Sequence, residues 1–198
     1  MLNAVPRPEN PDVRRRLLAS GMESFYLRGV NATGVKEITD RASVSKGTFY
    51  TYYSSKDDFV VAILQQYWSD LHRDVGSLLL ARGEPLQRLR WYFAAIAVDH
   101  ERHSFMLGCL IGNLALEVSA TSVAGREKLQ GILAAWEQQL ADVLSSGSSN
   151  QRREVAAAII ESWEGAVFRA KVDRSRAPYA RFDRITLPLL VGSLVDPH

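Results

Sequence analysis

The sequence has little of what secreted and membrane proteins depend on. It contains one cysteine in 198 residues, so no disulfide can form within the chain. No apolar run approaches the roughly 20 residues that a membrane-spanning helix needs, and the N-terminus lacks the apolar core of a signal peptide. These absences predict a cytoplasmic protein with no membrane partner.

The sequence also lacks the motifs that most enzymes and metalloproteins carry. No Gly-rich phosphate loop and no paired-carboxylate motif stands out. Two histidines, His100 and His103, lie three residues apart on a polar stretch, which we interpret as a solvated connector rather than a metal site. We expect no cofactor and no metal. The alternative class is a small helical enzyme with Cys109 as nucleophile, but no histidine has an evident route to that thiol.

What the chain does contain is helical periodicity. It is 46% hydrophobic and 23% charged, as ordinary globular proteins are, and it is long enough to bury a core. Apolar residues recur at three- and four-residue spacing along most of the chain. The pattern predicts an all-α fold of about nine helices, with a kink at Pro188. The expected helices are 12–28, 34–42, 46–53, 56–80, 85–99, 105–120, 123–144, 151–174 and 179–194.

Residues 34–56 are the most informative stretch. Ser45 can cap a helix of residues 46–53, in which hydroxyls, phenols and a lysine surround the apolar Phe49. A helix this short is unstable alone in water, so neighbouring helices must hold it while its polar side chains stay exposed. Such donors suit phosphate oxygens and base edges in a major groove. We therefore predict a helix-turn-helix that binds double-stranded DNA.

The distribution of charge agrees with a DNA-binding head. Residues 1–56 carry nine Lys or Arg against five Asp or Glu, a net charge of +4, whereas the remaining residues carry a net charge of −2. A basic N-terminal third on a slightly acidic body fits a head that approaches phosphates. We divide the chain into a flexible tail (1–11), a helix-turn-helix DNA-binding domain (12–55) and a helical effector-sensing and dimerisation domain (56–198).

Four N-terminal blocks have residue types at fixed spacing: Gly29-Val30, Val35–Ile38, Ala42–Tyr50 and Tyr52–Lys56. Together they resemble the signature of the TetR/AcrR family. The resemblance implies a homodimeric repressor that binds a near-palindromic operator and is released by a small effector. The sequence departs from the family at Ser43, where a turn glycine is usual and a positive φ is easier to adopt. Carried over by position, Phe49 and Tyr53 pack inward, and the DNA contacts are Lys36, Ser45, Lys46, Gly47, Thr48, Tyr50, Thr51, Tyr52 and Lys56.

The second informative stretch, residues 105–120, is almost wholly apolar and contains the only cysteine. We expect one buried helix with Cys109 at its middle. One interpretation makes Cys109 a small buried hydrophobe. The other makes it a sensor thiol, which requires a lowered pKa and access for the effector.

Two blocks stand out in the second half: Gly108–Leu110 with Asn113–Ala115, and Trp163–Ala166 with Ala170–Val172. They resemble regulators of the NemR and AcuR type, which respond to reactive electrophiles or small unsaturated acids such as acrylate. The resemblance implies that Cys109 is the sensing thiol. We hypothesise that Lys171 packs near it and lowers its pKa. The alternative is a sensor that binds a hydrophobic or aromatic ligand non-covalently. The candidate effector-sensing residues are Cys109, Lys171, Trp91, Phe105, Met106, Asn113 and Trp163.

Overall fold

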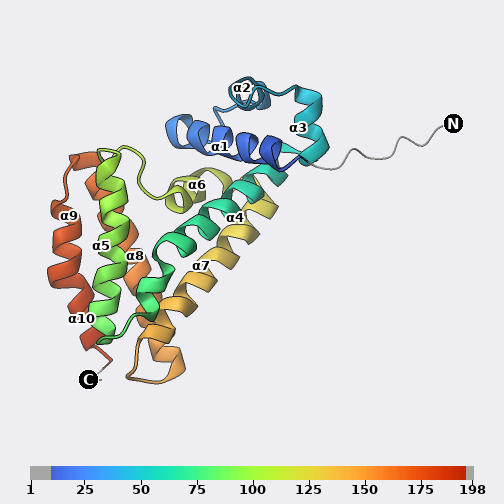
Figure 1. Cartoon of the computed structure of the whole chain (residues 1–198). Helices are drawn as coiled ribbons and strands as arrows, with labels where there is room; N and C mark the ends of the chain where they lie inside the picture. The colour runs from blue at the N-terminus through green and yellow to red at the C-terminus, as the bar shows by residue number, and fades with distance from the viewer. Residues whose placement is uncertain (1–9, 195–198) are drawn as a thin grey trace.

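The computed structural model describes residues 10–194, and this part of the chain folds into helices without any β-strand. A small head, α1 to α3, lies above a larger helical body, and the long helix α4 runs from one to the other (Figure 1). The expected all-α fold is confirmed. Residues 1–9 of the expected tail lie outside the described residues. Over residues 10–194, no helix has the length and apolarity that crossing a membrane requires.

The head contains α1 (Pro11–Arg28), α2 (Val35–Arg41) and α3 (Lys46–Tyr52). The Asn10 side chain caps α1 by accepting the N–H of Asp12 at 2.9 Å. The helix therefore starts one residue before the predicted range and includes Pro11, which needs no N–H partner in a first turn. Gly29 ends α1 with φ at 79°, a conformation that favours glycine.

Helix α4 (Lys56–Val75) belongs to both parts of the molecule. Ser55 caps it by accepting the N–H of Asp58 at 3.0 Å. Near its start the buried Phe59 lies so close to Gly21 of α1 that any Cβ there would clash with the ring. Further along, α4 packs beside α7 (Figure 1). The predicted helix to Leu80 instead narrows to a 3₁₀ segment over Gly76–Leu80.

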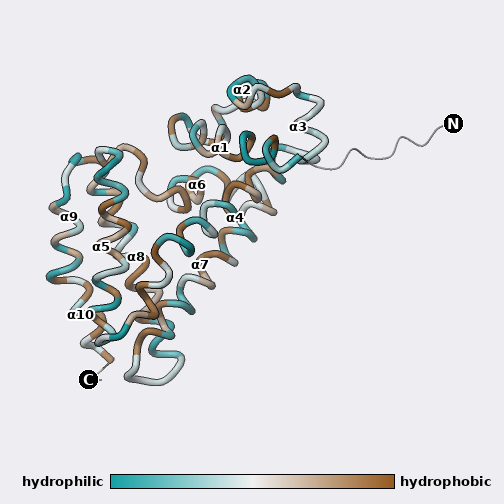
Figure 2. Tube along the Cα trace, in the orientation of Figure 1, coloured by the Kyte–Doolittle hydropathy of each residue, from teal (hydrophilic) through white to brown (hydrophobic). Residues whose placement is uncertain are grey.

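The body is built from amphipathic helices, in which hydrophilic and hydrophobic segments alternate along α4, α5 and α7 (Figure 2). A π-helical segment (Phe182–Thr186) joins the last two helices into one continuous rod. It precedes Pro188, whose missing N–H breaks the regular hydrogen-bond ladder, as predicted. With that rod counted once, the described residues form nine helical rods. The body helices are α5 (Pro85–Arg102), α6 (Leu110–Val118), α7 (Val123–Val143), α8 (Ser149–Asp173), α9 (Ala177–Arg181) and α10 (Leu187–Gly192).

Two predictions about the middle of the chain are wrong. Residues 105–120 do not form one helix, because Ser104, Phe105 and Gly108 adopt positive φ angles of 52°, 58° and 67° and keep the chain in a loop until α6 begins. Helix α5 also continues past residue 99 to Arg102. His100 is consequently buried, with its Nδ1 2.7 Å from the hydroxyl of Tyr179, and is no solvated connector.

Candidate functional site

Helix α3 is held in place by aromatic side chains on its inner face. Phe49 is completely buried, and its ring centroid lies 5.1 Å from that of Phe59 in α4. Tyr53, just after the helix, is also buried, with its ring centroid 4.8 Å from that of Phe59. The inward packing predicted for Phe49 and Tyr53 is confirmed. These contacts supply the stability that seven residues of isolated helix lack.

The turn before α3 is fixed by hydrogen bonds from α1. Ser43 adopts a φ of 53°, the left-handed conformation for which glycine is better suited. The guanidinium of Arg16 donates to the carbonyl of Ala42 at 2.8 Å, and the hydroxyl of Ser20 donates to the carbonyl of Ile38 at 2.8 Å. Ser45 then caps α3 by accepting the N–H of Thr48 at 3.0 Å. The hydrogen bond from Arg16 to the turn was not predicted, because the sequence does not show which of three consecutive arginines, Arg14 to Arg16, faces inward.

The outer face of α3 is polar and faces solvent. Lys46, Gly47, Tyr50 and Thr51 are exposed, and Thr48 is half-buried. The ammonium of Lys46 lies 6.0 Å from the ring centroid of Tyr50. A Cβ added at Gly47 would meet only the hydroxyl oxygen of Ser45, at 3.7 Å, so another molecule can approach this backbone closely. We call Lys46, Gly47, Thr48, Tyr50 and Thr51 the reading face.

The other four predicted DNA-binding residues have partners within the head: Ser45 caps α3, and Lys36, Tyr52 and Lys56 contact other parts of it. The hydroxyl of Tyr52 accepts the N–H of Asn10 at 2.7 Å and lies 3.2 Å from its carbonyl oxygen. The ammonium of the half-buried Lys56 donates to the carbonyl of Val30, and burial lowers the pKa of this lysine. Lys36 pairs with Asp40 at 2.6 Å on the surface. These residues therefore stabilise the head whether or not they also touch DNA.

In the body, Cys109 is buried and occupies the N-cap position of α6, where its side chain makes no capping hydrogen bond. The hydroxyl of Tyr67 in α4 lies 3.9 Å from its sulfur. The carboxyl group of Glu164 in α8 lies near this residue, because both flank Gly112: the position of a Cβ added there is 4.0 Å from the Cβ of Cys109. Gly112 leaves the room for that carboxyl group, since a Cβ there would clash with Oε2 of Glu164. We call Tyr67, Cys109, Gly112 and Glu164 the thiol cluster.

The predicted lowering of the Cys109 pKa by Lys171 is wrong. Burial raises the pKa of the thiol well above its ordinary value, and the carboxylate of Glu164 raises it further. Burial also raises the pKa of Glu164 to about 7. Lys171 does lie beside the thiol loop, where its ammonium is 3.2 Å from both the carbonyl oxygen of Leu107 and Oδ1 of Asn113. Its charge therefore supports the loop and does not activate the sulfur.

The predicted effector-sensing residues occupy three places. Cys109, Asn113 and Lys171 come together at the start of α6, where Nδ2 of Asn113 also donates to Leu107 at 2.8 Å. Trp163 is buried in α8 and stacks on Tyr179 with centroids 4.8 Å apart. The remaining three lie apart from the thiol, two being exposed and one buried in the loop before α6: Trp91, Met106 and Phe105.

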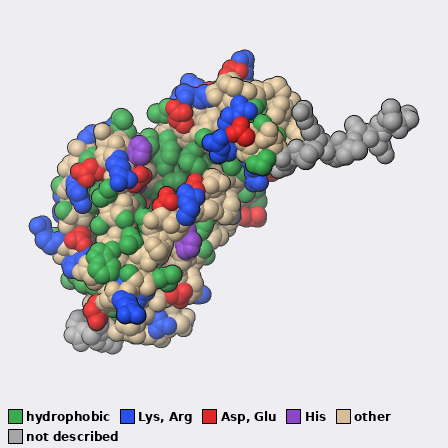
Figure 3. Space-filling model, in the orientation of Figure 1, with side chains coloured by type: hydrophobic (Ala, Val, Ile, Leu, Met, Phe, Trp, Pro, Cys, Tyr) green, Lys and Arg blue, Asp and Glu red, His purple; other side chains and the backbone are tan. Residues whose placement is uncertain are grey.

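A cavity of about 650 Å³ lies between the head and the body. Figure 3 shows hydrophobic side chains in a hollow at this place, with charged side chains around it. We call it the interdomain cavity. Tyr67 lines it, and its hydroxyl lies 3.9 Å from the sulfur of Cys109. Its lining comes from α1, α4, α5 and the loop before α6, and includes Met22, Tyr26, Tyr67, Leu71, Ile96 and Leu107.

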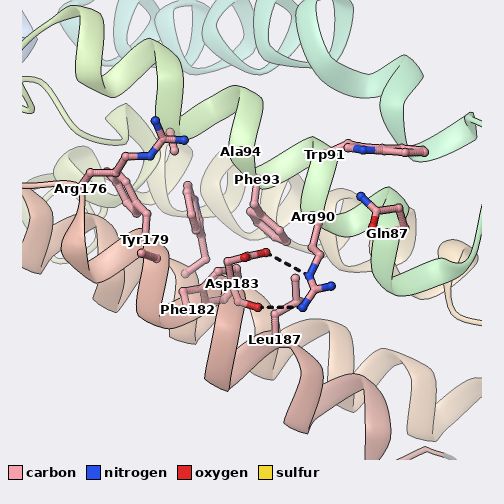
Figure 4. A pocket seen from close by; sticks show the side chains of 13 residues that line it. Gln87, Arg90, Trp91, Phe93, Ala94, Arg176, Tyr179, Phe182, Asp183 and Leu187 are labelled. Atoms are coloured by element: carbon pink, nitrogen blue, oxygen red, sulfur yellow. Dashed lines mark hydrogen bonds and ion pairs between the residues drawn. The ribbon is translucent and has the colours of Figure 1, made fainter.

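A second cavity, of about 370 Å³, opens between α5, α8 and α9, and we call it the outer cavity. Trp91, Phe93 and Trp163 are among its lining residues. Figure 4 shows Arg90 of α5 and Asp183 of the π-helical segment facing each other, with Nε and Oδ1 3.2 Å apart. The aromatic lining suits a flat apolar ligand.

Helix α6 also connects the body to the head. Near its C-terminal end, Oε2 of Glu117 accepts the N–H of Asn31 at 2.9 Å, in the turn between α1 and α2. Glu117 packs so tightly on that turn that a Cβ at Gly29 would clash with its carboxylate. This contact could not be predicted from local sequence pattern, because Asn31 and Glu117 are 86 residues apart. The thiol cluster and the head are therefore joined by one short helix.

Comparison with known proteins identifies relatives of both parts. The family described as "Bacterial regulatory proteins, tetR family" matches residues 17–63, and "Transcriptional regulator LmrA/YxaF-like, C-terminal domain" matches residues 85–184. The repressor DhaR of Mycobacterium sp. is 35% identical over 189 residues, which are 91% of this chain and 93% of that protein. AcuR of Cereibacter sphaeroides is 31% identical, with 89% and 84% covered.

Solved structures agree with these relatives. A regulatory protein TetR from Rhodobacter sphaeroides superposes with a TM-score of 0.79 at 32% identity, over 88% of this chain and 96% of that one. The reduced form of NemR from E. coli gives a TM-score of 0.77 at 27% identity, over 87% and 94%.

Proposed function

The chain belongs to the TetR family of bacterial transcriptional regulators, and from this premise we propose that it is a homodimeric repressor released from its operator by a small effector. The observation that carries the proposal is the reading face of α3, which is exposed, polar and held rigidly from behind. Among these residues Lys46, Thr48, Tyr50 and Thr51 supply donors to bases and phosphates, and Gly47 admits the DNA backbone. Ser45, Tyr52, Lys36 and Lys56 complete the surface.

The DNA contacts are tested by the salt dependence of binding. After selection of an operator from random duplexes, fluorescence anisotropy gives affinity as a function of salt concentration. Lys46→Ala weakens binding to all sequences and lowers the salt slope by about one, as the loss of one phosphate contact does. Lys128→Ala, which removes a cation from α7 in the body, is the matched control and leaves the slope unchanged. Equal slopes for both variants would contradict the assignment of Lys46.

The proposed dimer uses an apolar stripe on α8 and the final rod. Phe168 and Val172 of α8 are 68% and 63% exposed, and Leu189 of α10 is 69% exposed. Phe168 and Val172 are four residues apart and share one face of α8, as expected of a surface that another molecule covers. A second copy would bring two reading faces to successive major grooves, about 34 Å apart. Phe168→Glu makes the protein monomeric in sedimentation experiments, whereas Val123→Glu, an exposed apolar position in α7, leaves the dimer intact. A dimeric Phe168→Glu would exclude this interface.

For the effector, we propose a small uncharged electrophile that modifies Cys109. Three carboxylates line the interdomain cavity, those of Asp70, Asp74 and Asp99. Asp70 and Asp74 share Arg73, and Arg102 adds one more cation, so the surroundings keep an excess of negative charge. This charge disfavours the approach of small anions such as acrylate.

Replacement of the thiol tests this choice against the runner-up, a ligand held non-covalently in the outer cavity. Cys109→Ser stops release of DNA by a covalent effector, whereas a pocket ligand still releases the variant. Intact-mass measurement shows the adduct directly. Acrylamide and acrylate are the paired probes. For each, the rate of addition to Cys109 is divided by its rate of addition to free N-acetylcysteine, which corrects for its intrinsic reactivity. The charge argument predicts a larger ratio for acrylamide than for acrylate.

A further inference from the structure

We infer that Glu164 is the proton acceptor for Cys109 when an electrophile adds to the thiol. The inference rests on the proposed function in one respect, namely that Cys109 is the residue modified. It assigns to a carboxylate from α8 a chemical role that neither the sequence motifs nor the lone thiol indicated.

The neighbours of the sulfur support this role. The hydroxyl of Tyr67, 3.9 Å away, can donate to the sulfur and stabilise negative charge on it. Glu164 is the group of the thiol cluster that can take a proton away. Its Oε1 is shielded from solvent and has no hydrogen-bond partner among the described residues. That oxygen lies where burial is costly unless a proton or a donor arrives, and the thiol can supply the proton.

The acid–base properties of Glu164 suit the task. Burial raises its pKa to about 7, close to neutral pH, where a general base has both a useful ionised fraction and enough basicity. Lys171 cannot act as the base, because its ammonium group already donates to the carbonyl of Leu107 and to Oδ1 of Asn113.

The step balances without another reactant. When an α,β-unsaturated carbonyl compound such as acrylamide reaches the sulfur, the S–H proton passes to Glu164 as the sulfur forms a bond to the β-carbon. The π electrons of the carbon–carbon double bond move toward the carbonyl oxygen and give an enolate. Glu164 then returns the proton to the α-carbon. The product is a thioether on Cys109, and the carboxylate is regenerated. Access from the interdomain cavity passes Tyr67, which lines that cavity.

The test is the rate of acrylamide addition to the full-length protein, followed by intact mass between pH 5.5 and 9. Glu164→Gln slows the reaction at pH 7.5 by at least about tenfold, in line with the loss of a general base, and removes the inflection near pH 7. The matched control is Glu161→Gln, an exposed residue on the same helix. If Glu164 acted only through its charge, its neutralisation would lower the thiol pKa and speed the reaction. A faster Glu164→Gln variant therefore overturns the inference.

A second variant tests the same role of Glu164 without replacing it, in case Glu164→Gln does not fold. Gly112→Ala places a Cβ against Oε2 of Glu164 and pushes the carboxylate away. It slows acrylamide addition, whereas Gly131→Ala in α7, where an added Cβ meets nothing within 4 Å, does not. Circular dichroism and operator binding confirm that each variant folds. If wild-type Cys109 is not alkylated, both proposals fail. If it is alkylated and the protein stays on DNA, only the proposed release mechanism fails, and the rate ratio still decides the role of Glu164.

Discussion

The reading face and the thiol cluster place their functional groups in opposite surroundings. On α3 the polar groups are exposed, whereas the residues that anchor the helix to the rest of the head, above all Phe49, are buried on its inner face. In the thiol cluster Cys109 is buried, Tyr67 and Glu164 are half-buried with Oε1 of Glu164 shielded from solvent, and the residues come from three helices. DNA binding therefore depends on packing that never touches DNA. Thiol reactivity depends instead on burial, because burial sets the pKa values of both Cys109 and Glu164.

The largest effect expected is on the packing behind the reading face. Phe49→Ala removes a completely buried ring that contacts Phe59 and Tyr53, at a cost of about 3–5 kcal/mol in the free energy of unfolding. Because α3 cannot stand alone, operator binding is lost as well. Urea denaturation and anisotropy measure the two losses. Leu116→Ala, at a position 90% exposed, is the control and changes neither. A stable Phe49→Ala variant that still binds DNA would show that α3 does not depend on this ring.

The next effect is a pH dependence that separates the two buried titratable groups of the body. Burial raises the pKa of Glu164 to about 7, so the folded state binds the extra proton and gains stability as pH falls from 7 toward 4.5. Burial lowers the pKa of His100 to about 4. As pH falls from 6.5 toward 4, the unfolded state therefore binds a proton at His100 that the folded state does not, and the folded state loses stability. In the wild-type protein the two contributions oppose each other.

Glu164→Gln removes the contribution of Glu164 and leaves that of His100. Between pH 7.5 and 5 the variant loses about 2 kcal/mol of unfolding free energy relative to the wild-type protein, because it lacks the stabilisation that protonation of Glu164 gives the folded state. Urea denaturation at the two pH values measures the difference, with Glu161→Gln as the control. Parallel pH profiles for the wild-type protein and Glu164→Gln would mean that Glu164 titrates in the fold as it does in water.

The same contrast explains what the sequence could predict. The reading face lies within a few consecutive residues, so capping by Ser45, helical spacing and composition identified it without knowledge of the fold. The thiol cluster is assembled across long separations: Tyr67 and Cys109 are 42 residues apart. The charged neighbour of the thiol proved to be Glu164 and not Lys171, because local pattern does not show which side of α8 faces α6. Apolar composition also concealed the loop before α6, in which Ser104 and Phe105 adopt positive φ.

A smaller effect is expected where α6 joins the two regions. Glu117→Ala removes the acceptor for the N–H of Asn31, which costs about 1 kcal/mol and leaves α6 less firmly attached to the head. DNA binding persists, while the change in operator affinity caused by modification of Cys109 becomes smaller. Anisotropy with modified and unmodified protein gives that ratio. Glu127→Ala, an exposed carboxylate of α7, is the control. An unchanged ratio in Glu117→Ala would remove this contact from the coupling.

The smallest effect concerns two serines of the turn before α3. Ser43 holds a φ of 53° without the freedom of glycine, so Ser43→Gly relieves about 1 kcal/mol of backbone strain. The gain is partly offset by the greater entropy of glycine in the unfolded chain, which leaves a net stabilisation of a few tenths of a kcal/mol. Ser45→Ala has the opposite sign, because it removes the cap on the N–H of Thr48 and costs about 1 kcal/mol. Thermal denaturation of both variants compares them. Destabilisation by Ser43→Gly would mean that its side chain, and not only its backbone, is needed in the turn.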